Sequence, residues 1–118
     1  MVAVTITQTA LVGDSQGNIV LSHSAPVPAL EDDRVAVEHT PSALSGCDFA
    51  GVVTAVGTAA ARDGSIKGGD RICAAVSGPN PLRPDIGAFA THTTTPYWAS
   101  LKLPTTWRFP EGASLGTP

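Results

Sequence analysis

The chain has 118 residues, of which 42% are hydrophobic, and its formal net charge is −3 with only seven Lys and Arg residues. A chain of this length can bury roughly two-thirds of its unfolded surface, so residues 1–118 are expected to form one domain. The charge balance argues against nucleic acid or an anionic membrane as a partner.

No export or membrane signal is visible in the sequence. Residues 1–7 lack the basic segment and long apolar core of a signal peptide. No apolar run approaches the ~20 residues that a membrane-spanning helix needs. Cys47 and Cys73 lie in strand-like apolar contexts, and so sparse a pair is expected to be reduced and buried. We therefore expect a cytoplasmic protein.

Short β-branched runs bounded by glycine, proline, aspartate and asparagine recur along the chain, whereas helical periodicity is nearly absent. This pattern is typical of a mainly all-β fold. The expected strands are residues 7–12, 18–22, 34–39, 49–56, 71–76, 88–93 and 100–103.

The segments between these strands carry turn-forming residues. Residues 13–18 contain the glycine, aspartate and asparagine of a tight hairpin, so the first two strands should pair. Residues 24–33 include Pro26 and Pro28, which cannot donate ladder hydrogen bonds, and should form an extended connection.

Two later segments are rich in proline and glycine. Residues 77–85 hold three prolines and one glycine, which predicts a stiff loop of the kind that carries binding groups. Residues 104–118 are expected to form a surface tail, with at most a remnant helical turn at 113–115.

Several motifs follow one another at characteristic spacing. They are Gly46-Cys47-Asp48-Phe49-Ala50-Gly51, Val56-Gly57, Gly69-Asp70-Arg71, the Asn-Pro-Leu-Arg-Pro-Asp run at 80–85, and Gly87-Ala88-Phe89-Ala90. From about Gln8 to Leu115 the chain resembles the N-terminal part of medium-chain dehydrogenase/reductase enzymes, above all fungal trans-acting enoyl reductases of polyketide pathways. The resemblance implies a GroES-like, partly open β-barrel that covers a substrate cleft. In whole enzymes of this kind a Rossmann domain holds NADPH.

The 118 residues contain no Gly-x-Gly-x-x-Gly turn opening a helix, the motif that binds a dinucleotide pyrophosphate. The richest glycine cluster, residues 64–69, leads into a strand and is interpreted as a turn. We therefore expect no Rossmann domain and no cofactor. Metal is not expected either, because Cys47 and Asp48 replace the His-Glu pair of zinc-dependent relatives and no short-spaced ligand pair occurs.

The chain also departs from the resembled family inside the barrel. In family members the strand matching residues 35–38 continues through an Asn-Pro segment and a short helix before the Gly-Cys-Asp block. Here only His39 and Thr40 separate that strand from Pro41. The resemblance implies that the shortened segment lines the substrate cleft.

Three residues are candidates for catalysis. Asp48 follows the Gly46 turn, where a partly buried carboxylate can act as acid or base, or can instead accept bonds from backbone amides. His39 can titrate near neutrality or simply lie exposed at a strand end. Arg83 can offer planar donors to a carbonyl or carboxylate, or can pair with Asp85.

A second set of residues is expected to bind substrate. Tyr97 and Trp98 either wall an apolar cleft or cover the barrel end. His92 alternates in direction with Thr91, so one of the two faces outward. The full set is Cys47, Val76, Ser77, Asn80, His92, Tyr97 and Trp98.

These features predict a barrel that binds a small apolar polyketide-like intermediate and promotes a redox-neutral step such as cyclisation, isomerisation or a pericyclic reaction. The alternatives are a non-catalytic accessory or pseudoenzyme that contacts a polyketide synthase, and a decayed reductase fragment. Apolar surface that would face a Rossmann domain leads us to expect a homodimer.

Overall fold

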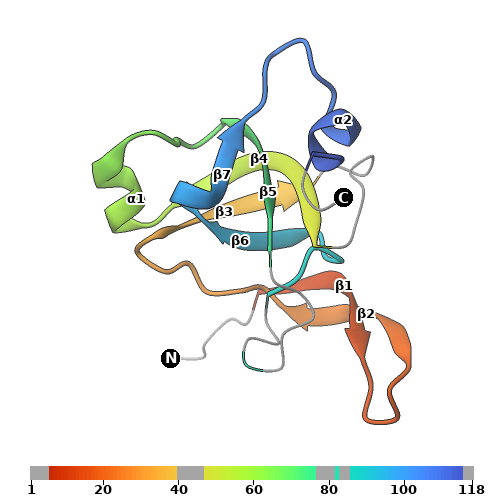
Figure 1. Cartoon of the computed structure of the whole chain (residues 1–118). Coiled ribbons are helices and arrows are strands. Elements are labelled where there is room, and N and C mark those ends of the chain that lie inside the picture. Colours follow the sequence, from red (N-terminus) through yellow and green to blue (C-terminus); the bar gives the residue numbers. More distant parts are fainter. Residues whose placement is uncertain (1–5, 40–46, 77–81, 83–85, 116–118) are drawn as a thin grey trace.

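The computed structural model describes residues 6–39, 47–76, 82 and 86–115. These residues form a two-stranded and a five-stranded antiparallel sheet with short helices around them (Figure 1). The strands are β1 (Thr7–Gly13), β2 (Ile19–Pro26), β3 (Arg34–His39), β4 (Asp48–Val56), β5 (Arg71–Ala75), β6 (His92–Pro96) and β7 (Ser100–Lys102). The helices are α1 (Thr58–Asp63), α2 (Phe109–Ala113) and the 3-10 helix η1 (Tyr97–Ala99). None of the described helices has the length and apolar character needed to cross a membrane.

The five-stranded sheet curls on itself. Its strand order is β6-β3-β4-β5-β7, so β6 and β7 are its two edges, yet only the three residues of η1 connect them. The Ser100 hydroxyl at the start of β7 donates to the Pro96 carbonyl at the end of β6, at 2.9 Å. The two edges therefore meet at one corner while the sheet stays open elsewhere. This confirms the partly open, mainly β architecture that the sequence predicts.

The inner face of the curled sheet carries the main core. Val35 and Val37 from β3, Phe49 from β4 and Ile72 from β5 are fully buried there. Side chains alternate across a strand, so the residues next to these point outward. Ala50 and Cys73 accordingly belong to a second cluster, which Leu103, Phe109 and Ala113 complete on the outer face. The middle of the sheet is thus buried on both sides.

Gly51 allows β3 and β4 to pack this closely. A Cβ atom at Gly51 would lie 2.8 Å from Val37 Cγ1 and closer still to the Glu38 carbonyl oxygen. Gly51 is also the register partner of His39. The glycine of the Asp-Phe-Ala-Gly motif is therefore required by the approach of the neighbouring backbone.

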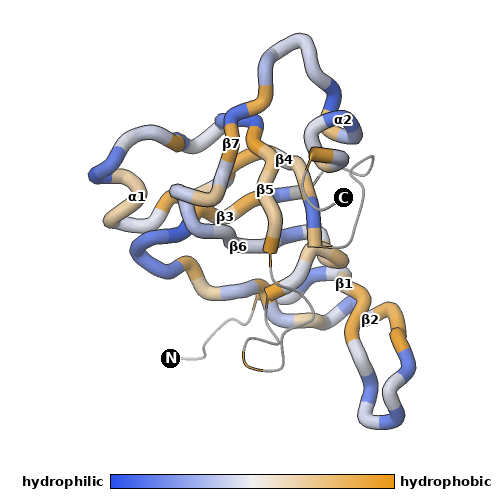
Figure 2. Tube along the Cα trace, in the orientation of Figure 1, coloured by the Kyte–Doolittle hydropathy of each residue, from blue (hydrophilic) through white to orange (hydrophobic). Residues whose placement is uncertain are grey.

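The β1–β2 hairpin projects from the curled sheet (Figure 1). Its turn is closed by Asp14, whose carboxylate accepts hydrogen bonds from the Asn18 and Gln16 N–H groups and consequently has a lowered pKa. The hairpin is joined to the rest of the molecule by a bridge between Ala10 and Ala90. Figure 2 shows apolar segments along both arms, where Ile19 is among the exposed apolar residues. The expected pairing of the first two strands is confirmed.

Two strand predictions need correction. The expected strand at 88–93 is displaced to His92–Pro96, and Ala90 forms only an isolated bridge. Pairing with β3 buries three consecutive threonines of β6, a polar run that hydrophobicity alone does not mark as a strand. In the predicted connection at 24–33, β2 continues to Pro26, whose carbonyl oxygen accepts a bond from Gln8 Nε2.

The helices also differ from expectation. The sequence pattern does not predict α1, although its three alanines favour a helix and Gly64, at φ +76°, ends it. In the predicted tail, α2 begins at Phe109, before the expected turn at 113–115. The Arg71 guanidinium holds this segment, because it donates to the Pro104 and Trp107 carbonyls and lies 4.5 Å from the Phe109 ring centre.

Thr93 and Thr95 bury hydroxyls that have no hydrogen-bond partner within the described part of the chain. Replacing either residue with valine removes the desolvated hydroxyl but keeps the shape, so the free energy of unfolding should rise by about 1 kcal/mol. Thr94→Val is the control. Thr94 Oγ1 accepts a hydrogen bond from Arg34 Nε at 2.9 Å, so losing this hydroxyl should lower the free energy of unfolding. Urea denaturation measures all three, and destabilisation by both Thr93→Val and Thr95→Val would contradict this account.

Asp70 should make stability depend on pH. Its carboxylate accepts the Lys67 N–H at 2.9 Å and pairs with Lys102 Nζ at 3.0 Å, and these contacts lower its pKa from 3.8. A lowered folded-state pKa stabilises the fold above the unfolded value, and that stability is lost as pH falls through the folded value. Asp70→Asn should therefore be less stable than wild type at neutral pH, and the difference should shrink below pH about 4. A difference that stays constant with pH in denaturation experiments would disprove this.

Candidate functional site

Several sequence-predicted site residues gather at one end of the five-stranded sheet. Neighbouring strands run antiparallel, so β3 and β5 end where β4 and β6 begin. The Val76 N–H, just after β5, donates to the Cys47 carbonyl, just before β4, at 2.7 Å. The residues at this end are His39, Cys47, Asp48, Val76 and His92.

Other predicted residues are not brought into this group. Ser77, Asn80 and Arg83 lie outside the described residues, as does the side chain of His39. Tyr97 packs against the main core, and its N–H donates to the Asp33 carbonyl at 3.1 Å. Trp98 is 71% exposed.

Asp48 lies on the outer face of the curled sheet. Phe49 points into the main core and Ala50 into the outer cluster, so alternation places Asp48 on the same face as Ala50. The Asp48 side chain is half-buried, and its register partner is Ala75 at the end of β5. The carboxylate therefore lies on the side of the barrel that α2 covers.

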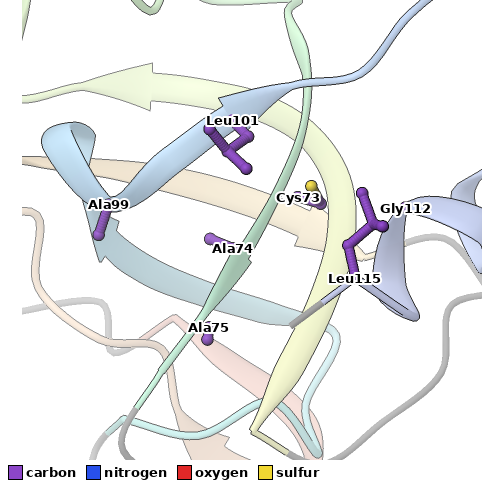
Figure 3. A pocket seen from close by; sticks show the side chains of 7 residues that line it. All are labelled: Cys73, Ala74, Ala75, Ala99, Leu101, Gly112 and Leu115. Atoms are coloured by element: carbon purple, nitrogen blue, oxygen red, sulfur yellow. The ribbon is translucent and has the colours of Figure 1, made fainter. Parts of the chain in front are cut away.

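An apolar cavity of about 180 Å³ opens on this outer face. Figure 3 shows Leu101 on one side of β5 and Leu115 on the other. The lining is formed by Cys73, Ala74, Ala75, Ala99, Leu101, Gly112 and Leu115. No lining residue carries a charge, and Ala75 places the cavity next to Asp48. A carboxylate beside an apolar hollow can hold or move a proton on a ligand whose hydrocarbon part is desolvated.

The two cysteines differ from each other. Cys73 is 4% exposed, and burial raises the pKa of its thiol, so it remains protonated and unreactive near neutral pH. Cys47 is exposed, contrary to the expectation that both are buried, because it precedes β4 and does not lie within it. Both are free thiols. Among the residues described here, no three His, Cys, Asp or Glu side chains gather as a metal site.

The surroundings of His92 include residues that the sequence analysis does not select. The His92 N–H donates to Gln8 Oε1 at 2.7 Å, and its ring Nδ1 lies 3.1 Å from Thr91 Oγ1. Gln8 is only 7% exposed. The sequence does carry a sign of this role. Gln8 lies two residues before Ala10, so its long polar side chain is on the same buried face of β1. A polar residue at a buried strand position needs specific partners, and here they position His92.

Curated relatives match nearly the whole chain, although no protein-family model matches it. Trans-enoyl reductase tasC of Hapsidospora irregularis is 49% identical over 129 aligned positions, which cover 93% of this chain and 34% of that relative. Trans-enoyl reductase cghC of Chaetomium globosum is 46% identical over 128 positions, with the same two coverages. The chain thus spans about a third of the length of these relatives.

The alignment length also bears on the internal shortening. The 129 aligned positions include about 110 residues of this chain, 93% of its 118, so about 19 residues of the Hapsidospora relative have no counterpart here. A shortened junction after His39 would account for this difference.

Solved structures share the fold. A mycobacterial protein in complex with NADPH has a TM-score of 0.71 at 20% identity, covering 92% of this chain and 37% of that one. Escherichia coli quinone oxidoreductase, also in complex with NADPH, has a TM-score of 0.66 at 18% identity, covering 92% and 36%. The chain is therefore similar in sequence to a part of fungal trans-enoyl reductases, and it shares the fold of solved oxidoreductases, which is the GroES-like fold that the sequence analysis expects.

Proposed function

We propose that this chain binds a polyketide-type intermediate and promotes a redox-neutral step, by cyclisation, isomerisation or a pericyclic reaction. The observation that carries the proposal is an apolar cavity beside the half-buried carboxylate of Asp48, on a barrel homologous to trans-enoyl reductases. The homology supplies the class of ligand, and the cavity and carboxylate supply a place where such a ligand can be held.

The cavity sets the size of the bound part. Its volume of about 180 Å³ equals roughly six water molecules at about 30 Å³ each, so it can hold a short hydrocarbon segment and not a whole polyketide. The remainder of the ligand would extend over the end of the sheet where Asp48 lies. Such a site lowers a barrier by desolvating and orienting the reacting carbons, which requires no change of oxidation state.

The reaction class can be tested directly. The purified chain is incubated with the compound that accumulates when its gene is deleted, and the product is compared by mass and chromatographic position. A product of equal mass is expected. A product that gains two hydrogens, formed only with a second chain and NADPH, would instead establish enoyl reduction.

The cavity can be blocked by one substitution. Ala75→Leu should fill it and weaken binding of the intermediate about 10-fold, the effect of losing apolar burial worth about 1.4 kcal/mol. Ala55→Leu is the matched control, because Ala55 is an exposed position of β4 that does not line the cavity. Equal binding by wild type and Ala75→Leu in calorimetry or fluorescence titration would show that the ligand binds elsewhere.

A non-catalytic accessory role is the second candidate. Trp98, Leu101 and Leu115 are 71%, 63% and 53% exposed, and the last two line the cavity. Exposed tryptophan and leucine side chains are typical of protein contact surfaces. We propose that a second copy of the chain covers these side chains, which makes the protein a homodimer. A polyketide synthase is the alternative partner for the same side chains.

The homodimer can be tested by mass. Light scattering should give twice the chain's 12.0 kDa, and Leu101→Asp should return the monomer because it puts a charge into the apolar contact. Ile19→Asp is the control, since Ile19 is 75% exposed on the hairpin, away from this surface. A monomeric wild type that still binds a polyketide synthase through Leu101 would favour the accessory role.

A further inference from the structure

The orientation of the buried Gln8 amide is fixed by its partners. Its Nε2 donates to the Pro26 carbonyl at 3.1 Å, and its Oε1 accepts the His92 N–H at 2.7 Å. If the amide were flipped, its oxygen would lie against the Pro26 carbonyl oxygen and its NH₂ group against the His92 N–H, and neither pair can form a hydrogen bond. The atom near β6 is therefore the oxygen, which can only accept hydrogen bonds.

This acceptor determines the direction of the Thr91 hydroxyl. Thr91 Oγ1 lies 3.3 Å from Gln8 Oε1 and 3.1 Å from His92 Nδ1. Gln8 Oε1 cannot donate, so the Thr91 hydroxyl is the donor in the contact between these two oxygen atoms. If the hydroxyl instead donated to the ring, two oxygen atoms would face each other at 3.3 Å with no proton between them.

The hydroxyl direction in turn sets the proton on the imidazole. With its own proton given to Gln8, Thr91 Oγ1 can only accept from His92 Nδ1, which must then carry a hydrogen. In the neutral ring the lone pair is left on Nε2. His92 is half-buried on β6, at the same end of the sheet as Asp48 and the end of β5, with β3 and β4 lying between β6 and β5.

We propose that Gln8 and Thr91 hold His92 in its Nδ1–H form, so that Nε2 is the prepared proton acceptor of this chain. The chemical role rests on the proposed function and narrows it to double-bond migration in an unsaturated carbonyl compound. Asp48 is then left to orient the ligand at the cavity.

The step is balanced without an oxidant or reductant. Nε2 takes a proton from the carbon between a carbonyl and an isolated double bond, and the electron pair of that C–H bond moves into the conjugated enolate. The imidazolium returns the proton to the far carbon of the former double bond. The product is the conjugated isomer of equal mass, and His92 is neutral again.

The proton position can be read without any substrate. Long-range proton–nitrogen correlation spectra of the neutral ring should show His92 protonated on Nδ1. Thr91→Val should release this preference. Thr9→Val is the control, because it removes the hydroxyl 3.1 Å from His23 Nδ1 and should leave His92 unchanged. A wild-type His92 protonated on Nε2 overturns the proposal.

The chemical role is tested with a β,γ-unsaturated hexenoyl thioester in heavy water. Wild type should catalyse deuterium incorporation and conjugation, His92→Gln should slow both at least 100-fold, and His23→Gln should not. If His92→Gln leaves both rates unchanged, the proposed role of His92 as the base is overturned, although the chain still catalyses the isomerisation. No incorporation by wild type would overturn the proposed isomerisation, whereas the spectra test the proton position independently.

Discussion

The close approach of β3 and β4 at Gly51 is the constraint on which the rest of the structure depends. With no side chain at Gly51, the Glu38 backbone can lie directly against β4. This contact brings Val35 and Val37 against Phe49 and Val53 in one core. It also sets the register that pairs His39 with Gly51, so the end of the sheet where Asp48 lies is fixed by a packing requirement in its middle.

The two faces of the curled sheet have different roles. The inner face is filled by branched apolar side chains together with Thr93 and Thr95 of β6, which pair with Val37 and Val35, and its function is stability. The outer face uses small residues, and the space they leave between β5, β7 and α2 forms the cavity. Arg71 stabilises this arrangement, because it ties the segment before α2 to β5. Small side chains on an otherwise covered face thus leave a cavity, while the core of the inner face stays filled.

The sequence predicts β1, β3, β4 and β5 well because glycine, aspartate and proline lie at or near their ends. It misplaces β6, because the burial of Thr93, Thr94 and Thr95 comes from pairing with β3 and not from local hydrophobicity. The sequence pattern does not reveal α1, because six residues are too few to show helical periodicity. The cavity could not be predicted, since it joins residues from β5, β7 and α2 that are brought together only by the curl of the sheet.

The attachment of the hairpin gives it a meaning beyond architecture. Gln8 belongs to β1, yet it supplies the oxygen that accepts from the His92 backbone and from Thr91. The position of the hairpin and the position of the proton on the His92 ring are therefore coupled through Gln8. A molecule that pulled the exposed arm away would also change which ring nitrogen carries the proton. Binding of another molecule to the projecting hairpin would in that way control the protonation of the His92 ring at the end of the sheet.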